Sequence, residues 1–200
     1  YSNAILGRIE EVSFSDEKLR DQLIGEARFM RAWNYFNLVR TFGELPIILD
    51  ELNSPEEDFD KNRRPVAEVY DLIIEDLRVA RERLPETHGN TKGRATSGAA
   101  TALLGKVFLT AGRYEESASL FAEVIQSGRY ELEADYGALF APNNANLPES
   151  IFEIEFTSGE IGEGHNLAAM ATPADFGLDM FPGGVTGGGR STPTQELVDA

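Results

Sequence analysis

Histidine and cysteine are side chains that could carry nucleophilic or metal chemistry. The two histidines, His88 and His165, lie in segments with the composition of loops. A metal site or a catalytic triad needs partners at a suggestive spacing, and neither histidine has them. The chain contains no cysteine, which removes thiolate nucleophiles and cysteine metal sites. The sequence therefore predicts no catalytic residue, no metal site and no cofactor.

The carboxylates occur as a run and as adjacent pairs. The acidic run at 56–60 could supply oxygen ligands to calcium, although we expect a solvated acidic loop there. Glutamates are adjacent at 10–11 and at 115–116. Neighbouring helix positions do not face each other. Neither pair therefore resembles the two opposed carboxylates of a glycoside hydrolase.

Aromatic side chains are the remaining groups that could bind a ligand, by stacking. Trp33 is the only tryptophan, and it lies inside an apolar helical segment, so core packing is expected. Phe176 and Phe181 lie in a glycine-rich, irregular region where loops could meet a ligand. Asn166 and Arg190 could add hydrogen bonds there. We predict these four residues as a ligand-binding set, with loop packing as the alternative.

The charge of the chain limits its partners. Lysine and arginine number 18 and aspartate and glutamate 34, which gives a net charge of −16. Such a surface repels phosphate backbones, so nucleic acid is not an expected partner. The apolar stretches are shorter than the ~20 residues of a membrane-spanning helix.

Four helices are predicted from hydrophobic periodicity and from end signals. They span 16–42, 66–84, 96–111 and 114–127. Asp16 is a predicted N-cap, and apolar residues surround most of the helix at 29–42, which predicts packing on most sides. The helix at 66–84 has one apolar stripe, and its charged residues, among them Asp76, are expected to lie mostly off that stripe.

The remaining segments predict a loop insertion and an irregular region. The connection at 44–64 is long for a compact domain, which indicates an insertion or a binding loop. Residues 151–156 alternate apolar and acidic types, as in a half-buried strand. We therefore expect one incomplete domain with a helical region at 1–130 and an irregular, strand-containing, ligand-side region at 131–200.

The two helices at 96–127 fit the tetratricopeptide spacing, with Thr101 in place of its first tryptophan. The matching residues are Leu104, Gly105, Phe108, Gly112, Tyr114, Ser117 and Phe121. A hairpin of this kind cannot bury its apolar face alone, so hairpins stack into a solenoid. We expect the helices at 16–42 and 66–84 to form the second pair.

Six strings, in order along the chain, resemble the SusD/RagB family. The longest is GEARFMRAWNYFNLVRTFGELP at 25–46, and VYDLIIEDL follows at 69–77. The others lie at 93–114, 123–132, 149–154 (ESIFEI) and 192–199 (TPTQELVD). Together they indicate a mainly α fold of the SusD type.

This resemblance implies a lipoprotein on the bacterial outer membrane that pairs with a SusC-like TonB-dependent transporter. Members capture glycans or oligosaccharides, and sometimes peptides, without catalysis. The family's lipidated N-terminal cysteine has no counterpart in this sequence. Both ends of the chain read as interrupted elements, so we expect a piece of a longer protein.

Two other classes of function are alternatives to nutrient capture. A tetratricopeptide-type scaffold for a protein partner would continue as bare helix pairs beyond residue 130, whereas the predicted strand and the glycine-rich region argue against that. An enzyme with a helical domain lacks a residue set to support it.

Overall fold

The computed structural model describes residues 1–51, 62–89, 91, 93–140 and 145–154. The chain divides into two compact units, Tyr1–Glu153 and Ile154–Ala200. The described elements are α1 (Ser2–Arg8), the 3-10 helix η1 (Ile9–Glu11), α2 (Glu17–Phe42), α3 (Val66–Arg83), α4 (Ser97–Thr110), α5 (Tyr114–Gln126) and the 3-10 helix η3 (Tyr136–Phe140). The predicted mainly helical class is confirmed.

The ends of the long helices follow the local signals of the sequence. The Asp16 carboxylate accepts a hydrogen bond from the Lys18 amide at 2.9 Å, which caps α2. The Thr96 hydroxyl accepts one from the Ala99 amide at 3.2 Å and caps α4. Gly43 follows α2 with a φ of 72°, a left-handed value that favours glycine.

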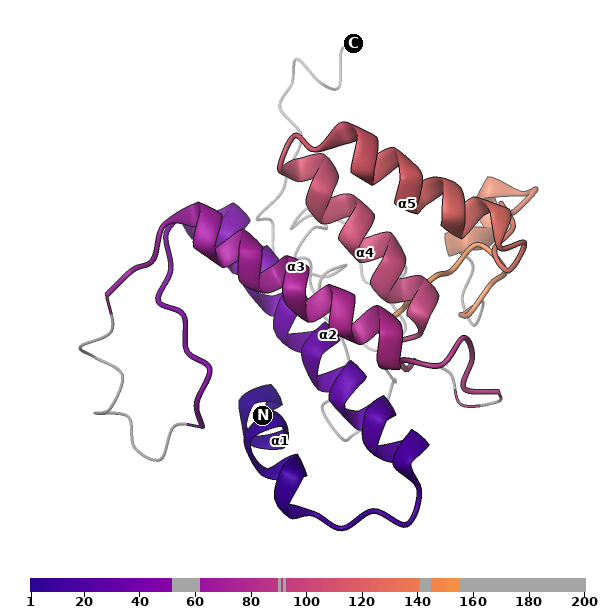
Figure 1. Ribbon diagram of the computed structural model, residues 1–200. Coiled ribbons are helices and arrows are strands. Elements are labelled where there is room, and N and C mark those ends of the chain that lie inside the picture. Colours follow the sequence, from indigo (N-terminus) through magenta and orange to yellow (C-terminus); the bar gives the residue numbers. More distant parts are fainter. Residues whose placement is uncertain (52–61, 90, 92, 141–144, 155–200) are drawn as a thin grey trace, which may run out of the picture. The chain divides into compact units, whose positions relative to one another are not determined.

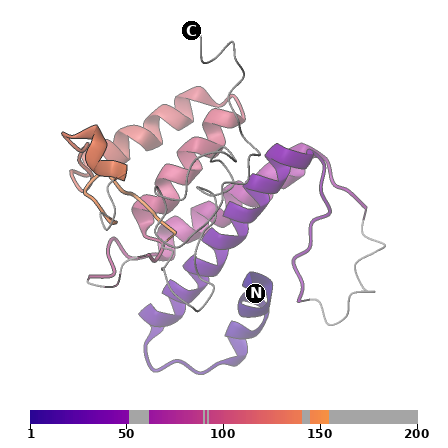
Figure 2. The same cartoon turned by 180° about the vertical axis from the view of Figure 1, so that it is seen from behind.

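The helices of the first unit pack on one another in chain order. α1 lies on α2, α2 packs against α3, α3 packs against α4, and α4 packs against α5 (Figure 1). The same order is visible from behind, where α2 crosses in front of α3 (Figure 2). α2–α3 and α4–α5 are therefore two stacked hairpins, as predicted from the sequence, and α3 is buried between α2 and α4.

The core lies on both sides of α3. Val69, Ile73 and Leu77 of α3 are fully buried, and Phe29 of α2 and Val107 of α4 are fully buried as well. Packing on most sides was predicted for residues 29–42, but only one face of this stretch is buried. Its other face exposes Met30, Leu38 and Phe42, with 38%, 42% and 64% of their surfaces accessible.

The α4–α5 hairpin has the close contacts that its sequence predicts. Ser117 is buried, and its hydroxyl donates a hydrogen bond to the Gly105 carbonyl at 2.9 Å. A Cβ on Gly105 would lie 2.9 Å from the Phe121 ring, so glycine is what permits this approach. Gly112 makes the turn with a φ of 77°.

Two further segments are described in part: the ends of the α2–α3 connection and the first four residues of the predicted strand. The α2–α3 connection is closed at its base by an antiparallel bridge between Leu45 and Arg64, with the Arg64 amide 2.7 Å from the Leu45 carbonyl. The strand predicted at 151–156 is absent from its described part, 151–154. Ile151 and Phe152 both pack against the core, so the segment does not alternate between two faces as a strand does.

Candidate functional site

The predicted ligand-binding residues lie outside the described part of the chain. Asn166, Phe176, Phe181 and Arg190 all fall within 155–200, so this set stays a prediction. The acidic run at 56–60 and His165 also lie outside it. Among the described residues, no three histidine or acidic side chains lie close enough together to hold a metal ion.

A buried ion-pair network joins α2 to α3. Asp76 of α3 has no accessible surface. Its carboxylate accepts two hydrogen bonds from Arg31 of α2, at 2.7 and 2.8 Å. Arg28 of α2 donates a third at 2.7 Å. Burying a charge is costly unless it is paired and hydrogen-bonded, and two guanidinium groups supply that pairing here.

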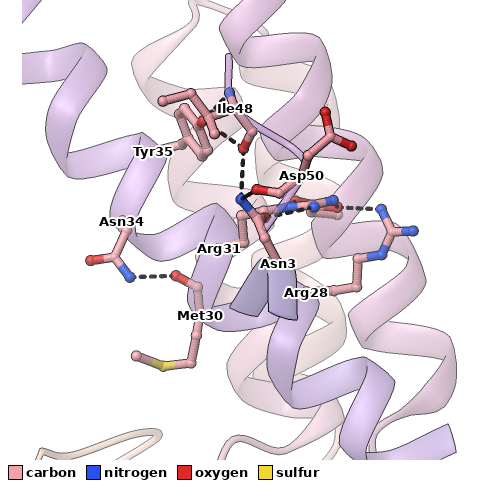
Figure 3. A network of polar contacts seen from close by, with 9 residues as sticks. Asn3, Arg28, Met30, Arg31, Asn34, Tyr35, Ile48 and Asp50 are labelled. Carbon is pink, nitrogen blue, oxygen red and sulfur yellow. Dashed lines mark hydrogen bonds and ion pairs between the residues drawn. The ribbon is translucent and has the colours of Figure 1, made fainter. Parts of the chain in front are cut away.

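The network continues from Arg31 to the start of the α2–α3 connection (Figure 3). Arg31 donates to the Asn3 side-chain oxygen at 3.2 Å. The Asn3 amide in turn donates to the carbonyls of Ile48 at 2.9 Å and Asp50 at 3.2 Å. The Tyr35 hydroxyl accepts a hydrogen bond from the Ile48 amide at 2.8 Å. These contacts tie α1, α2, α3 and the segment at 44–51 together.

The role of Asp76 contradicts its predicted placement off the apolar stripe. Asp76 follows Ile73 by three residues and precedes Ala80 by four, and both of these neighbours are buried. That spacing puts Asp76 on the buried face of α3. The signal was present in the sequence, but a carboxylate is rarely fully buried without a partner, and no partner could be recognised from sequence alone.

A hollow of about 620 Å³ has a lining of mixed polar and apolar side chains, and we call it the polar hollow to distinguish it from the apolar groove described below. Three segments of the first unit surround it: the α3–α4 connection, the turn after α5, and the segment at 146–153. Residues from these segments that face it include His88, Arg94, Tyr130, Leu147, Ser150 and Phe152. Its size is within the ~300–1,000 Å³ typical of small-molecule sites.

Ion pairs and hydrogen bonds hold the walls of this hollow. Arg94 forms a two-pronged ion pair with Glu26 of α2, at 2.8 and 3.0 Å. Arg129 pairs with the Glu86 carboxylate and donates to the Glu86 carbonyl. Both arginines are therefore neutralised by carboxylates of the same chain.

The opposite wall is held mainly through backbone amides. The Glu131 amide donates to the Pro148 carbonyl at 3.1 Å. The Glu133 amide donates to the Glu149 carboxylate at 2.8 Å. Asn146 has a positive φ of 59°, and its amide donates to the Glu153 carboxylate at 3.1 Å. A hollow with both walls braced in this way is preformed.

His88 occupies a buried position in the first wall. Its side chain is only 5% accessible. Its Nε2 lies 2.7 Å from the Ala95 carbonyl oxygen, and because a carbonyl can only accept, Nε2 carries the proton. The other nitrogen, Nδ1, has no hydrogen-bond partner within the described part of the chain. Sequence reasoning predicted a loop position for His88 and no catalytic or metal-binding role. The contact with Ala95 was missed because it depends on the turn between the two residues.

An apolar groove of about 400 Å³ lies beside α4. Trp33 packs against the core, as predicted, but part of its ring lines this groove. The ring of Phe152 lies edge-on to the rings of Trp33 and Phe29, with ring centroids 5.9 and 5.1 Å apart respectively. Lys106 is the one charged side chain among the described residues that line the groove.

These features define the class of protein: a helical protein built from stacked hairpins, with a preformed polar hollow beside them. Residues 1–109 match the family model SusD-like_3, described as starch-binding and associating with the outer membrane. The chain therefore belongs to the SusD-like family, and the resemblance seen in its sequence is confirmed.

Relatives of known sequence or structure agree with this assignment. SusD-like protein P2 of Formosa agariphila is 34% identical over 164 residues, which are 78% of this chain and 32% of that protein. A SusD-like crystal structure from Bacteroides fragilis has a TM-score of 0.81 and 33% identity, covering 99% of this chain and 38% of that one.

A laminarin-binding SusD-like protein is also similar. Its TM-score is 0.80 with 30% identity, and the match covers 87% of this chain and 41% of that structure. The chain spans about a third of the length of the curated relatives it matches.

Proposed function

We propose that the protein to which this chain belongs captures a glycan at the outer membrane without cleaving it. The family match over residues 1–109 carries this proposal, since the family is described as starch-binding and associating with the outer membrane. Similarity to a laminarin-binding protein supports a glycan as the ligand. A peptide is the alternative ligand class.

We also propose that the captured glycan is delivered to a SusC-like TonB-dependent transporter and that the protein is a cell-surface lipoprotein. The family's association with the outer membrane supports that location. The described residues contain no helix long and apolar enough to cross a membrane. The predicted partner and lipid anchor come from the family resemblance.

The capture proposal is tested with the full-length protein and immobilised polysaccharides. We expect retention on starch or laminarin beads and release by the soluble oligosaccharide. Co-purification of a TonB-dependent transporter from detergent-solubilised outer membranes would support delivery. If the protein is not retained on any polysaccharide of a broad panel, that result would contradict capture of a glycan.

A protein-binding scaffold is a second candidate function, favoured by the α4–α5 hairpin. Gly105, Ser117 and Gly112 make the close contacts and the turn of a tetratricopeptide-type hairpin, and arrays of such hairpins bind partner proteins. This function predicts a stable protein complex that forms equally well with and without glycan. Capture predicts that a glycan binds to the isolated protein.

A further inference from the structure

We infer that the polar hollow between the α3–α4 connection and residues 146–153 is a binding subsite for a neutral sugar unit, with His88 Nδ1 as the acceptor of a sugar hydroxyl. This inference rests on the proposed glycan capture, and it adds a location and a recognising atom. The location differs from the predicted set in 155–200.

The state of His88 supplies the first argument. The ring is 95% enclosed and held by the Nε2 contact to the Ala95 carbonyl. Nδ1 is therefore a lone-pair acceptor. Arg28 Nε is the one fully enclosed, unpartnered side-chain nitrogen or oxygen of the described residues, so Nδ1 is not fully enclosed, and His88 is one of the residues that line the hollow. An acceptor that keeps accessible surface can receive a hydrogen bond from a ligand hydroxyl.

The charges around the hollow supply the second argument. Its two arginines are paired, Arg94 with Glu26 and Arg129 with Glu86. No unpaired cation thus remains among the described lining residues to attract an anionic group. The chain as a whole has a net charge of −16, which repels anions further. A neutral ligand therefore fits this hollow better than a phosphate or a uronic acid.

The mixture of lining surfaces supplies the third argument. Tyr130 and Phe152 are aromatic, and Leu147 and Ile151 are aliphatic, while Ser150 adds a hydroxyl. Sugars present apolar C–H faces together with hydroxyl edges, so they need apolar and hydrogen-bonding surfaces side by side. The adjoining groove at Trp33 is almost wholly apolar and lacks the second kind of surface.

Two changes in the full-length protein test the subsite. Ser150→Trp would fill the hollow, and His88→Leu would remove the acceptor. Titration with laminarihexaose and maltohexaose should show at least about tenfold weaker binding for Ser150→Trp, and a loss of about five- to tenfold for His88→Leu, as expected for one lost hydrogen bond. His88→Gln can both donate and accept, so its affinity should stay within about threefold of wild type.

Thr110→Trp is the matched control, because Thr110 is exposed at the opposite end of α4 from Thr96. It should bind as wild type does. Thermal unfolding of each variant checks that it is folded. If His88→Leu does not fold, a laminarihexaose that carries a diazirine tests the subsite in the wild-type protein. It should crosslink to peptides that contain 86–89 or 146–153.

The outcomes separate the subsite from the proposed function. The subsite is overturned if the wild type binds glycan, Ser150→Trp binds it with the same affinity, and the crosslinks fall in other peptides. Glycan capture would still stand in that case. If the wild type binds neither these oligosaccharides nor any glycan of a broad panel, capture itself fails and the subsite fails with it.

Discussion

Asp76 is the residue on which the α2–α3 contact most depends. Its carboxylate is fully buried and accepts hydrogen bonds from both Arg28 and Arg31. A buried ion pair adds little to stability compared with a well-packed apolar pair, but removal of one partner leaves an uncompensated charge. The residue is therefore sensitive to substitution through the stability of the α2–α3 contact.

Asp76→Asn should destabilise the protein by about 3–5 kcal/mol, because Arg31 would keep its charge in the interior without a counterion. Urea unfolding followed by circular dichroism measures the free energy of unfolding. Glu75→Gln, an exposed neighbour on α3, is the control and should change it by less than about 0.5 kcal/mol. A cost of less than about 1 kcal/mol for Asp76→Asn would contradict the role given to this network.

Glu116 offers a test of pairing at the surface. The hydrogen bond from Arg113 lowers the pKa of the Glu116 carboxyl below its usual value. Because the pKa of Glu116 is lower in the folded state, this pair contributes to stability at pH values above the pKa that Glu116 has in the unfolded chain. This contribution is lost as the pH falls through the folded-state pKa.

Arg113→Gln should therefore raise the pKa of Glu116 toward its usual value, as followed by NMR titration of the side-chain carboxyl. Arg81→Gln is the control, because Arg81 pairs with Glu123 and not with Glu116. An unchanged Glu116 pKa in Arg113→Gln would show that the pair does not persist in solution.

The α4–α5 hairpin is the element whose structure follows most directly from its sequence. Small residues occur where the helices approach: Gly105 beneath the Phe121 ring, and Ser117 donating to the Gly105 carbonyl. Arg113 lies over the Phe108 ring at 4.2 Å and pairs with Glu116, so it supports the turn at Gly112. Each contact lies within one hairpin and is local in sequence.

Gly105→Ala should lower stability by about 1–3 kcal/mol, because the added methyl group would press on the Phe121 ring. Gly7→Ala in α1 is the matched control. A Cβ there meets nothing within 4 Å, so that change should be neutral or stabilise by up to about 1 kcal/mol. Thermal unfolding compares the two, and equal effects would argue against the close helix approach.

Helix spans and hairpin pairing could be predicted because caps, glycine stops and apolar periodicity are local signals. Asp16, Thr96, Gly43 and Gly112 are such signals. The buried network and the hollow could not be predicted, since Asp76 meets Arg31 across 45 residues. The strand predicted over 151–156 was wrong in its described part, because alternation alone does not supply a partner strand.

At the scale of the whole molecule, ion pairs connect the strings that resemble the SusD/RagB family. The string at 25–46 supplies Glu26 to Arg94 of the third string, and Arg31 to Asp76 of the second. The first contact holds a wall of the polar hollow, and the second holds the α2–α3 hairpin. The family resemblance therefore coincides with the contacts that organise the first unit.

Neutral-sugar recognition by a chain of net charge −16 has a consequence for salt dependence. The affinity for laminarihexaose should change by less than about twofold between 50 and 500 mM sodium chloride, because screening acts on charge–charge attraction and the ligand carries none. A sulfated oligosaccharide of the same length is the comparison. Tighter binding of that anion at low salt would contradict a neutral ligand.

Calorimetric titration of the full-length protein with laminarihexaose and maltohexaose, followed by chromatography of the recovered sugar, tests the central claim most directly. Glycan capture without catalysis predicts saturable heats for at least one glycan of a panel extended from these two, and recovery of the oligosaccharide at its original length. Heats of dilution alone across that panel, or shortened products, would contradict it.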